Sequence, residues 1–252
     1  MPRSLKLVCD PVEAVIADIR AGRMVIVTDD ADRENEGDLI CAAEKITPEM
    51  VTFMVREGAG MLCVPVSREI AKNLGLESMV PQNREAFTTA FTVTVDAAKG
   101  ITTGISAADR ARTIRLLADP KSKADDFVQP GHINPLVAKP GGVLRRAGHT
   151  EAATDLARLA GLREAGVLIE IMNPDGTMAR LPDLKKFAKK HKLKICSIAD
   201  LIAYRRKSEK LVERIEVVEM PTDYGEFKLH LYKSHLDGIH HVALVKGDIK
   251  GT

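Results

Sequence analysis

Apolar positions follow alternating helical and strand periods over the first 206 residues of the chain. Residues 11–21 carry apolar side chains at helical spacing, and the β-branched run 24–28 predicts a short buried strand. Further helices are predicted at 48–58, 106–118, 151–160, 183–191 and 199–206. Further strands are predicted at 38–44, 61–66, 89–96, 166–172 and 193–197. This alternation predicts an α/β (α+β) domain with a three-layer arrangement, in which a mixed sheet is flanked by helices.

The pattern changes after Tyr204, where a charged linker at 205–210 leads into a β-rich tail. Strand-like runs at 215–222, 226–233 and 240–246 are separated by turn residues. We therefore expect one domain at 1–206 and a separate β-rich segment at 207–252. So short a segment buries little surface alone, so it is either an appendage packed on the first domain or the opening piece of a longer one.

Composition excludes several classes of protein. The 252 residues include 37 basic and 35 acidic side chains, a net charge of +2, which gives no electrostatic footprint for nucleic acid or an anionic membrane. No apolar run reaches the ~18 residues of a membrane-spanning helix, and no secretory leader is recognisable. The four cysteines are scattered without a C-x-x-C pair, so they are expected to be free thiols rather than zinc ligands. The expected location is cytoplasmic.

An acidic loop between two predicted strands is the first candidate for chemistry. It holds six carboxylates between Asp29 and Asp38, and charges of one sign at that density repel each other unless a cation lies among them. A hard divalent cation such as Mg²⁺ prefers these oxygens, and Arg33 offers a clamp for an anion. The alternative is a solvated acidic loop.

The second candidate is the basic segment 141–151, which precedes a predicted helix. Arg146, Thr150 and the free amides of the helix N-terminus would suit a phosphate. His149 could complete a metal site with a carboxylate of the acidic loop. The alternative is a capped helix with basic residues on the protein surface.

Three weaker candidates remain. His132 lies among Gly and Pro residues that predict a rigid turn, which suits an acid or base but also a structural histidine. Glu170 lies inside an apolar strand, so it needs a partner or a raised pKa unless it faces water. The loop 102–106 could cradle an oxyanion.

Together these segments resemble a known family. DRENEGDL, TTGISAADRA, PGHI, GGVLRRAGHTEAATDLARLAGL and EIMNPDGTMARLPDL occur in the order and spacing of 3,4-dihydroxy-2-butanone 4-phosphate synthase, over residues 9–206. The resemblance implies a homodimeric lyase of riboflavin biosynthesis that converts D-ribulose 5-phosphate to L-3,4-dihydroxy-2-butanone 4-phosphate and formate. From about Glu213 the tail resembles the opening of GTP cyclohydrolase II. It stops before the zinc-binding cysteines of that enzyme, so cyclohydrolase activity is not expected.

The resemblance also implies a role for individual residues. Glu34 and His149 would hold Mg²⁺ or Mn²⁺. The implied catalytic positions are His132, Glu170, Glu36 and Cys63, of which the last two line the pocket. The implied substrate-binding positions are Arg33, Glu34, Asp38, Thr103, Ser106, Asp109, Arg146, Ala147, Gly148, His149, Thr150 and Glu170. Two rivals remain: a metal-dependent sugar-phosphate isomerase or aldolase, and a non-catalytic assembly or regulatory subunit.

Overall fold

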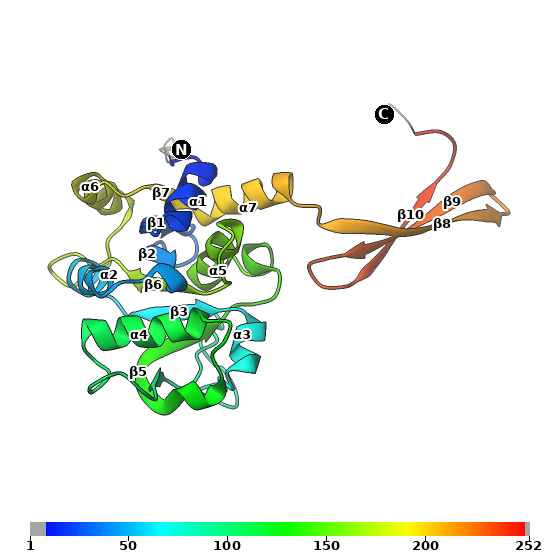
Figure 1. Ribbon diagram of the computed structural model, residues 1–252. Coiled ribbons are helices and arrows are strands. Elements are labelled where there is room, and N and C mark those ends of the chain that lie inside the picture. Colours follow the sequence, from blue (N-terminus) through cyan, green and yellow to red (C-terminus); the bar gives the residue numbers. More distant parts are fainter. Residues whose placement is uncertain (1–8, 250–252) are drawn as a thin grey trace. The chain divides into compact units, whose positions relative to one another are not determined.

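A computed structural model of the chain describes residues 9–249. The chain divides into two compact units, residues 1–202 and residues 203–252 (Figure 1).

The first unit is built on one seven-stranded sheet with the strand order β4-β5-β3-β6-β2-β1-β7. The strands are β1 Val25–Thr28, β2 Gly37–Ala42, β3 Cys63–Val66, β4 Val95–Ala97, β5 Phe127–Val137, β6 Gly166–Glu170 and β7 Ile195–Ser197. The pairs β1–β7 and β3–β5 are parallel and the other pairs are antiparallel. The predicted mixed sheet is therefore confirmed.

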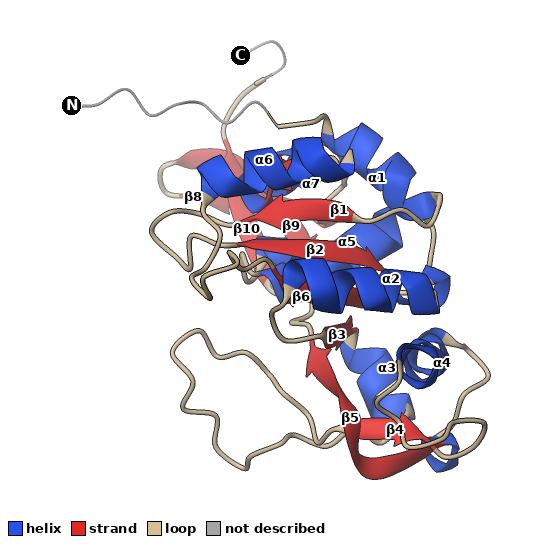
Figure 2. Cartoon of the chain, turned by 90° about the vertical axis from the view of Figure 1, so that its left-hand side faces the viewer, coloured by secondary structure: helices blue, strands red, loops and turns tan. Residues whose placement is uncertain are grey.

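Helices cover both faces of this sheet. They are α1 Val12–Arg20, α2 Pro48–Phe53, α3 Arg68–Asn73, α4 Ala107–Ala118, α5 His149–Leu159, α6 Leu181–His191 and α7 Ile198–Ser208. A π-turn at Met54–Gly58 extends α2, and short 3₁₀ turns lie at Ala43–Lys45, Ala124–Asp126 and Gly142–Leu144. In Figure 2, α2 and α6 lie in front of the sheet and α5 lies behind it, where α5 contacts β1, β2, β3 and β6.

The central strands have no polar face. Every residue of β2 is buried. Leu39 and Cys41 pack into the core cluster on one face of the sheet, and Ile40, on the other face, is equally buried. Burying a side chain of this size stabilises the fold by roughly 1.5–3 kcal/mol. Strands covered on both faces read as continuous apolar runs. A carboxylate such as Asp38 in β2 is therefore conspicuous.

Two local predictions were wrong. Residues 89–94 form no regular strand, and only the last two residues of the predicted strand 89–96 belong to β4, which runs from Val95 to Ala97. The predicted rigid turn around His132 lies instead inside the long strand β5. The physical reason is an irregular register: Asp96 pairs with Val128 while Val95 pairs with Ile133. The Gly- and Pro-containing stretch between those two partners bulges out of the ladder, so its sequence resembles a turn.

The second unit contains a three-stranded antiparallel sheet with the order β10-β9-β8. Its strands are β8 Val212–Thr222, β9 Gly225–Ser234 and β10 His240–Val245, which confirms the three strand-like runs of the tail. Among the described residues of the chain, no helix is long and apolar enough to cross a membrane.

Candidate functional site

The acidic loop, the adjoining ends of β2 and β6 and the first turn of α5 surround a cleft of about 220 Å³. The cleft gathers residues that lie far apart in the sequence, and the antiparallel register of β2 and β6 sets Asp38 directly opposite Glu170. Its lining includes Arg33, Glu34, Asp38, Cys63, Arg146, His149, Thr150 and Glu170. Each of these residues was expected to belong to a site.

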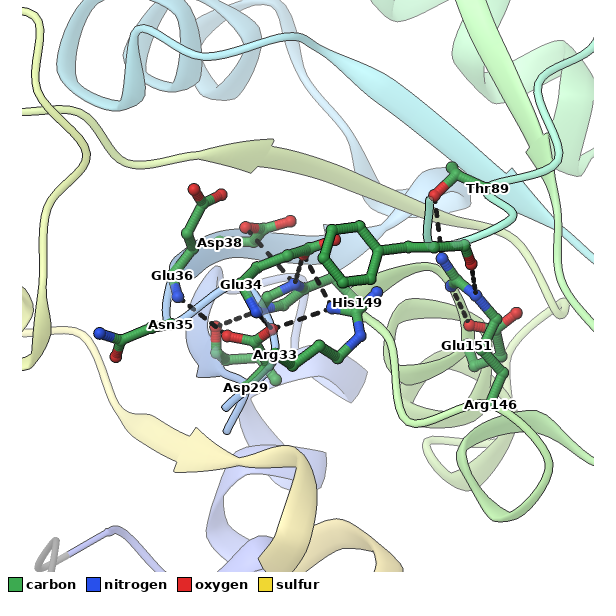
Figure 3. A network of polar contacts seen from close by, with 12 residues as sticks. Asp29, Arg33, Glu34, Asn35, Glu36, Asp38, Thr89, Arg146, His149 and Glu151 are labelled. Carbon is green, nitrogen blue, oxygen red and sulfur yellow. Dashed lines mark hydrogen bonds and ion pairs between the residues drawn. The ribbon is translucent and has the colours of Figure 1, made fainter. Parts of the chain in front are cut away.

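Asp29 gives the acidic loop its shape. Its Oδ1 accepts the backbone N–H of Glu36 at 2.8 Å, and its Oδ2 accepts the backbone N–H of Glu34 at 3.0 Å and the Nη1 of Arg33 at 2.9 Å (Figure 3). Arg180 donates from α6's side of the loop to the backbone carbonyls of Glu34 and Asn35. Sequence reasoning counted Asp29 among the six carboxylates but gave it no role, and it missed Arg180.

A potential metal centre lies at the inner side of this loop. His149 Nδ1 lies 3.6 Å from Glu34 Oε2 and 3.8 Å from Asp38 Oδ1. One ligand atom each from Asp29, Glu34 and His149 lies within 4.8 Å of the others. His149 Nε2 is 3.2 Å from the carbonyl oxygen of Val27, which can only accept, so this nitrogen donates its proton and Nδ1, on the side of Glu34, is the nitrogen that a cation would bind.

The charged groups of the cleft favour the binding of a cation. Burial raises the pKa of Asp38 to about 7, and its Oδ1 is a buried atom with no hydrogen-bond partner among the described residues. Burial lowers the pKa of His149, but the negative charges of Asp38 and Glu34 outweigh burial and raise that pKa to about 9. Oxygen ligands, one imidazole and an unsatisfied carboxylate oxygen fit a divalent cation.

The remaining carboxylates and the thiol differ in their surroundings. Burial and the charge of Glu34 raise the pKa of Glu36, whereas for Glu34 hydrogen bonding to His149 and the charge of Arg33 outweigh burial and lower the pKa. Glu170 Oε2 accepts the backbone N–H of Met61 at 2.7 Å. Burial raises the pKa of Cys63, so its thiol stays protonated and lines the cleft as a neutral group.

The basic half of the cleft lies at the N-terminus of α5. Gly148 precedes the helix without a side-chain cap, which leaves the amides of the first turn facing the cleft. A Cβ at Gly148 would collide with Arg146 Nη1 and lie 3.1 Å from Arg33 Nη2, so both guanidinium groups lie close to this helix end and a larger residue would displace them. Helix amides flanked by two arginines suit a phosphate.

A loop that sequence reasoning missed contacts both arginines. Arg146 donates to the Phe87 carbonyl at 3.0 Å and to Thr89 Oγ1 at 2.9 Å, and it pairs with Glu151 at 2.6 Å. The guanidinium of Arg33 lies 5.0 Å from the centre of the Phe87 ring. No motif or period in the sequence marks this loop, and only the fold brings it to the arginines.

A second group of predicted residues lies outside this cleft. His132 Nδ1 is 2.6 Å from Asp96 Oδ2, and Asp109 accepts from Thr102 Oγ1 and from the amide of Gly104. Ser106 caps α4 by accepting the amide of Asp109. Thr103 is exposed, and Ala147 lines a different cavity of about 460 Å³. None of the described contacts joins His132 to Glu34 or His149.

The two units of the chain match two different families of known proteins. Residues 13–204 match the family model for 3,4-dihydroxy-2-butanone 4-phosphate synthase, and residues 213–252 match the model for GTP cyclohydrolase II. The riboflavin biosynthesis protein RibBA of Mycolicibacterium gilvum is 58% identical over 244 residues, which cover 96% of this chain and 58% of that protein. RibBA of Aquifex aeolicus is 56% identical over 241 residues, covering 95% of this chain and 59% of that protein. The chain thus spans less than two thirds of the length of these relatives.

Solved structures give the same result. The two-domain 3,4-dihydroxy-2-butanone 4-phosphate synthase RibBX of A. baumannii superposes with a TM-score of 0.89 at 53% identity, covering 96% of this chain and 72% of that one. A 3,4-dihydroxy-2-butanone 4-phosphate synthase in complex with two magnesium ions superposes with a TM-score of 0.76 at 43% identity, covering 79% of this chain and 98% of that one. The match across most of the chain, together with the cleft described above, establishes that the chain belongs to the 3,4-dihydroxy-2-butanone 4-phosphate synthase family.

Proposed function

We propose that the chain converts D-ribulose 5-phosphate to L-3,4-dihydroxy-2-butanone 4-phosphate and formate, as a lyase of riboflavin biosynthesis. The observation that carries this proposal is the cleft in which Glu34, Asp38 and His149 lie beside the uncapped end of α5. A polyhydroxy sugar phosphate carries one anionic end and several oxygens. The basic half of the cleft would bind the anionic phosphate end. The acidic half would hold a cation that binds the sugar oxygens.

Within the cleft we assign the cation to Glu34 and His149, with Mg²⁺ or Mn²⁺ as the ion. Asp29 is the less suitable ligand, because three hydrogen bonds already occupy its two oxygens. A bound divalent ion would polarise the substrate carbonyl and its neighbouring hydroxyls as a Lewis acid. Asp38 would accept a hydrogen bond from a substrate hydroxyl through its unpartnered Oδ1.

The phosphate would lie at the first turn of α5, held by the amides of His149 and Thr150 and by Arg146 and Arg33. Binding at this end, remote from the reacting carbons, fixes the orientation of the sugar. Glu170 would act as a general base, because the Met61 amide fixes one of its oxygens and the other is free to take a proton. Glu36 and Cys63 would line the pocket.

We also propose that the enzyme is a cytoplasmic homodimer. His132 matches a catalytic position of the family, yet no described contact brings it to the cleft of its own chain. A homodimer would resolve this separation, with His132 of the partner subunit completing each cleft. Thr103, Ser106 and Asp109 lie on the loop and helix beside His132 and would reach substrate in the same way.

The two domains are proposed at 1–206 and 207–252, with the synthase activity in the first and a partial GTP cyclohydrolase II-like segment in the second. The contact-based division after residue 202 and the family matches at 13–204 and 213–252 support this boundary.

The test is formate release from D-ribulose 5-phosphate by the purified chain, first with Mg²⁺ and then with EDTA. We expect formate with the ion and none with the chelator. An isomerase or aldolase would consume the sugar phosphate without forming formate, and a non-catalytic subunit would not consume it. Either result would overturn the proposal.

A further inference from the structure

The contacts of His132 point to a residue with no sequence motif of its own. The carboxylate of Asp96 holds His132 twice: Oδ1 accepts the backbone N–H at 3.0 Å, and Oδ2 lies 2.6 Å from ring Nδ1. Asp96 is 4% exposed, whereas the side chain of His132 is 43% exposed. One face of the imidazole is thus fixed by a buried carboxylate while the ring remains open to an incoming molecule.

The irregular register of β4 and β5 creates this arrangement. Strand β5 bulges between Val128, which pairs with Asp96, and Ile133, which pairs with Val95. His132 is the last residue of this bulge, and it contacts Asp96. The amide of Gly131 donates to Thr94 Oγ1 at 3.0 Å, which ties the bulge to the segment that precedes β4. The histidine therefore stands on backbone that is fixed on both sides.

Gly104 packs against the contact between Asp96 and His132. Its φ is +94°, and a Cβ there would collide with Asp96 Oδ2 and lie 2.6 Å from His132 Nδ1. Asp109 accepts the Gly104 amide at 3.2 Å and so holds this loop in place. Only a residue without a side chain allows the loop to pack this closely on the histidine–aspartate contact.

We propose that Asp96 is a positioning residue that fixes His132 as the tautomer with its proton on Nδ1, so that Nε2 is a second proton acceptor in addition to the proposed base Glu170. This inference rests on the proposed function and identifies how its second histidine works. An ionised carboxylate only accepts hydrogen bonds, so the ring nitrogen that faces it carries the proton.

The proton balance is simple. Nε2 uses its lone pair to take a proton from a substrate carbon or hydroxyl next to the carbonyl, and the electron pair of the broken bond stays on the substrate. The ring then carries a proton on each nitrogen, and its positive charge is balanced by Asp96, which keeps its negative charge. Return of the proton from Nε2 restores the starting state.

The experiment uses Asp96→Asn in the full chain, with Asp223→Asn as the matched control because Asp223 is exposed and distant in sequence from this contact. We expect kcat for formate release to fall by about 10²–10⁴ while KM stays within a factor of about three, since general-base catalysis contributes on that scale. In the His132→Ala background, Asp96→Asn should cause no further loss. Asp96→Glu, which retains the carboxylate, should recover part of kcat.

Nitrogen NMR separates this inference from the proposed function. In ¹⁵N-histidine-labelled protein, the signal assigned by its loss in His132→Ala should show an unprotonated Nε2 when the ring is neutral, and Asp96→Asn should change that tautomer. A wild-type ring protonated on Nε2, or an Asp96→Asn variant with unchanged kcat, overturns the positioning role even where formate is formed. Wild-type protein that forms no formate overturns the proposed function, whatever the tautomer. If Asp96→Asn does not fold, the wild-type tautomer and the kcat of Asp96→Glu still decide the question.

Discussion

His149 and His132 lie on the same α/β unit but in opposite surroundings. His149 is 5% exposed, donates Nε2–H to a backbone carbonyl and turns Nδ1 toward Glu34 and Asp38. His132 turns Nδ1 toward a single carboxylate and leaves the rest of its ring open. The Val27 carbonyl binds Nε2 of His149, so Nδ1 faces the cleft. The Asp96 carboxylate binds Nδ1 of His132, so Nε2 faces away from that carboxylate. A buried Nδ1 among carboxylates suits a cation, and an open Nε2 suits proton transfer.

The largest expected effect separates these two roles. Glu34→Ala and His149→Ala should keep the fold but reduce formate release by about a thousandfold or more, because Lewis-acid stabilisation is worth several kcal/mol. Mn²⁺ binding, followed by electron paramagnetic resonance, should be lost in both variants and unchanged in His132→Ala. Turnover that survives in either variant would remove the metal assignment, and loss of Mn²⁺ binding in His132→Ala would merge the two sites into one.

A mixing experiment tests whether the two histidines act on one substrate across a dimer. Glu34→Ala and His132→Ala are each expected to be inactive. After their subunits are exchanged at equal amounts, about a quarter of wild-type activity should return, because half of the dimers are mixed and each mixed dimer holds one intact site. Co-purification of differently tagged subunits shows that exchange has occurred. Exchange without recovery of activity would place both histidines of each site in the same subunit.

The sequence was sufficient to predict one of these histidine sites and insufficient for the other. The alternating pattern predicted the mixed sheet and its helices, the residue types of the acidic loop and the α5 segment suggested a carboxylate beside His149, and the family resemblance implied that this carboxylate is Glu34. The Asp96–His132 contact depends on a bulge in β5, and no local pattern predicts which residues a bulge brings together. Phe87 was missed for a similar reason, since an irregular loop has no period to read. The catalytic roles of all these residues stay predictions.

A smaller effect is expected at the loop beside the basic half of the cleft. Phe87→Leu removes the ring under Arg33 and should weaken sugar-phosphate binding by about 0.5–2 kcal/mol, with a rise in KM of about twofold to thirtyfold. Val80→Ala is the control, because Val80 belongs to the same loop and is 44% exposed. We expect kcat and Mn²⁺ binding to stay close to wild type in both variants. An unchanged KM in Phe87→Leu would show that Arg33 does not need the ring.

The smallest expected effect concerns two buried carboxylates, which differ in their surroundings as the two histidines do. Asp38 and Asp18 are both buried, but Asp38 lies among other carboxylates, and burial raises its pKa to about 7. Burial acts on Asp18 in the same direction, yet Arg23 at 2.5 Å and Lys194 at 2.6 Å outweigh burial and lower its pKa. Burial therefore sets the direction of the pKa shift in Asp38, whereas neighbouring positive charge reverses the effect of burial in Asp18.

This difference predicts how stability depends on pH. Because Asp18 has a lower pKa in the folded chain than the ~3.9 of an unfolded one, its contribution is present above about pH 3.9 and is lost as the pH falls through the folded value. Asp18→Asn should thus lower the free energy of unfolding at pH 7 by on the order of 1 kcal/mol, a small value because water screens Arg23, which is 59% exposed. Urea unfolding at pH 7 and at about pH 3 measures the difference, which should shrink at the lower pH. An equal loss at both values would mean that Asp18 acts through hydrogen bonding alone, and that its charge contributes nothing to the fold.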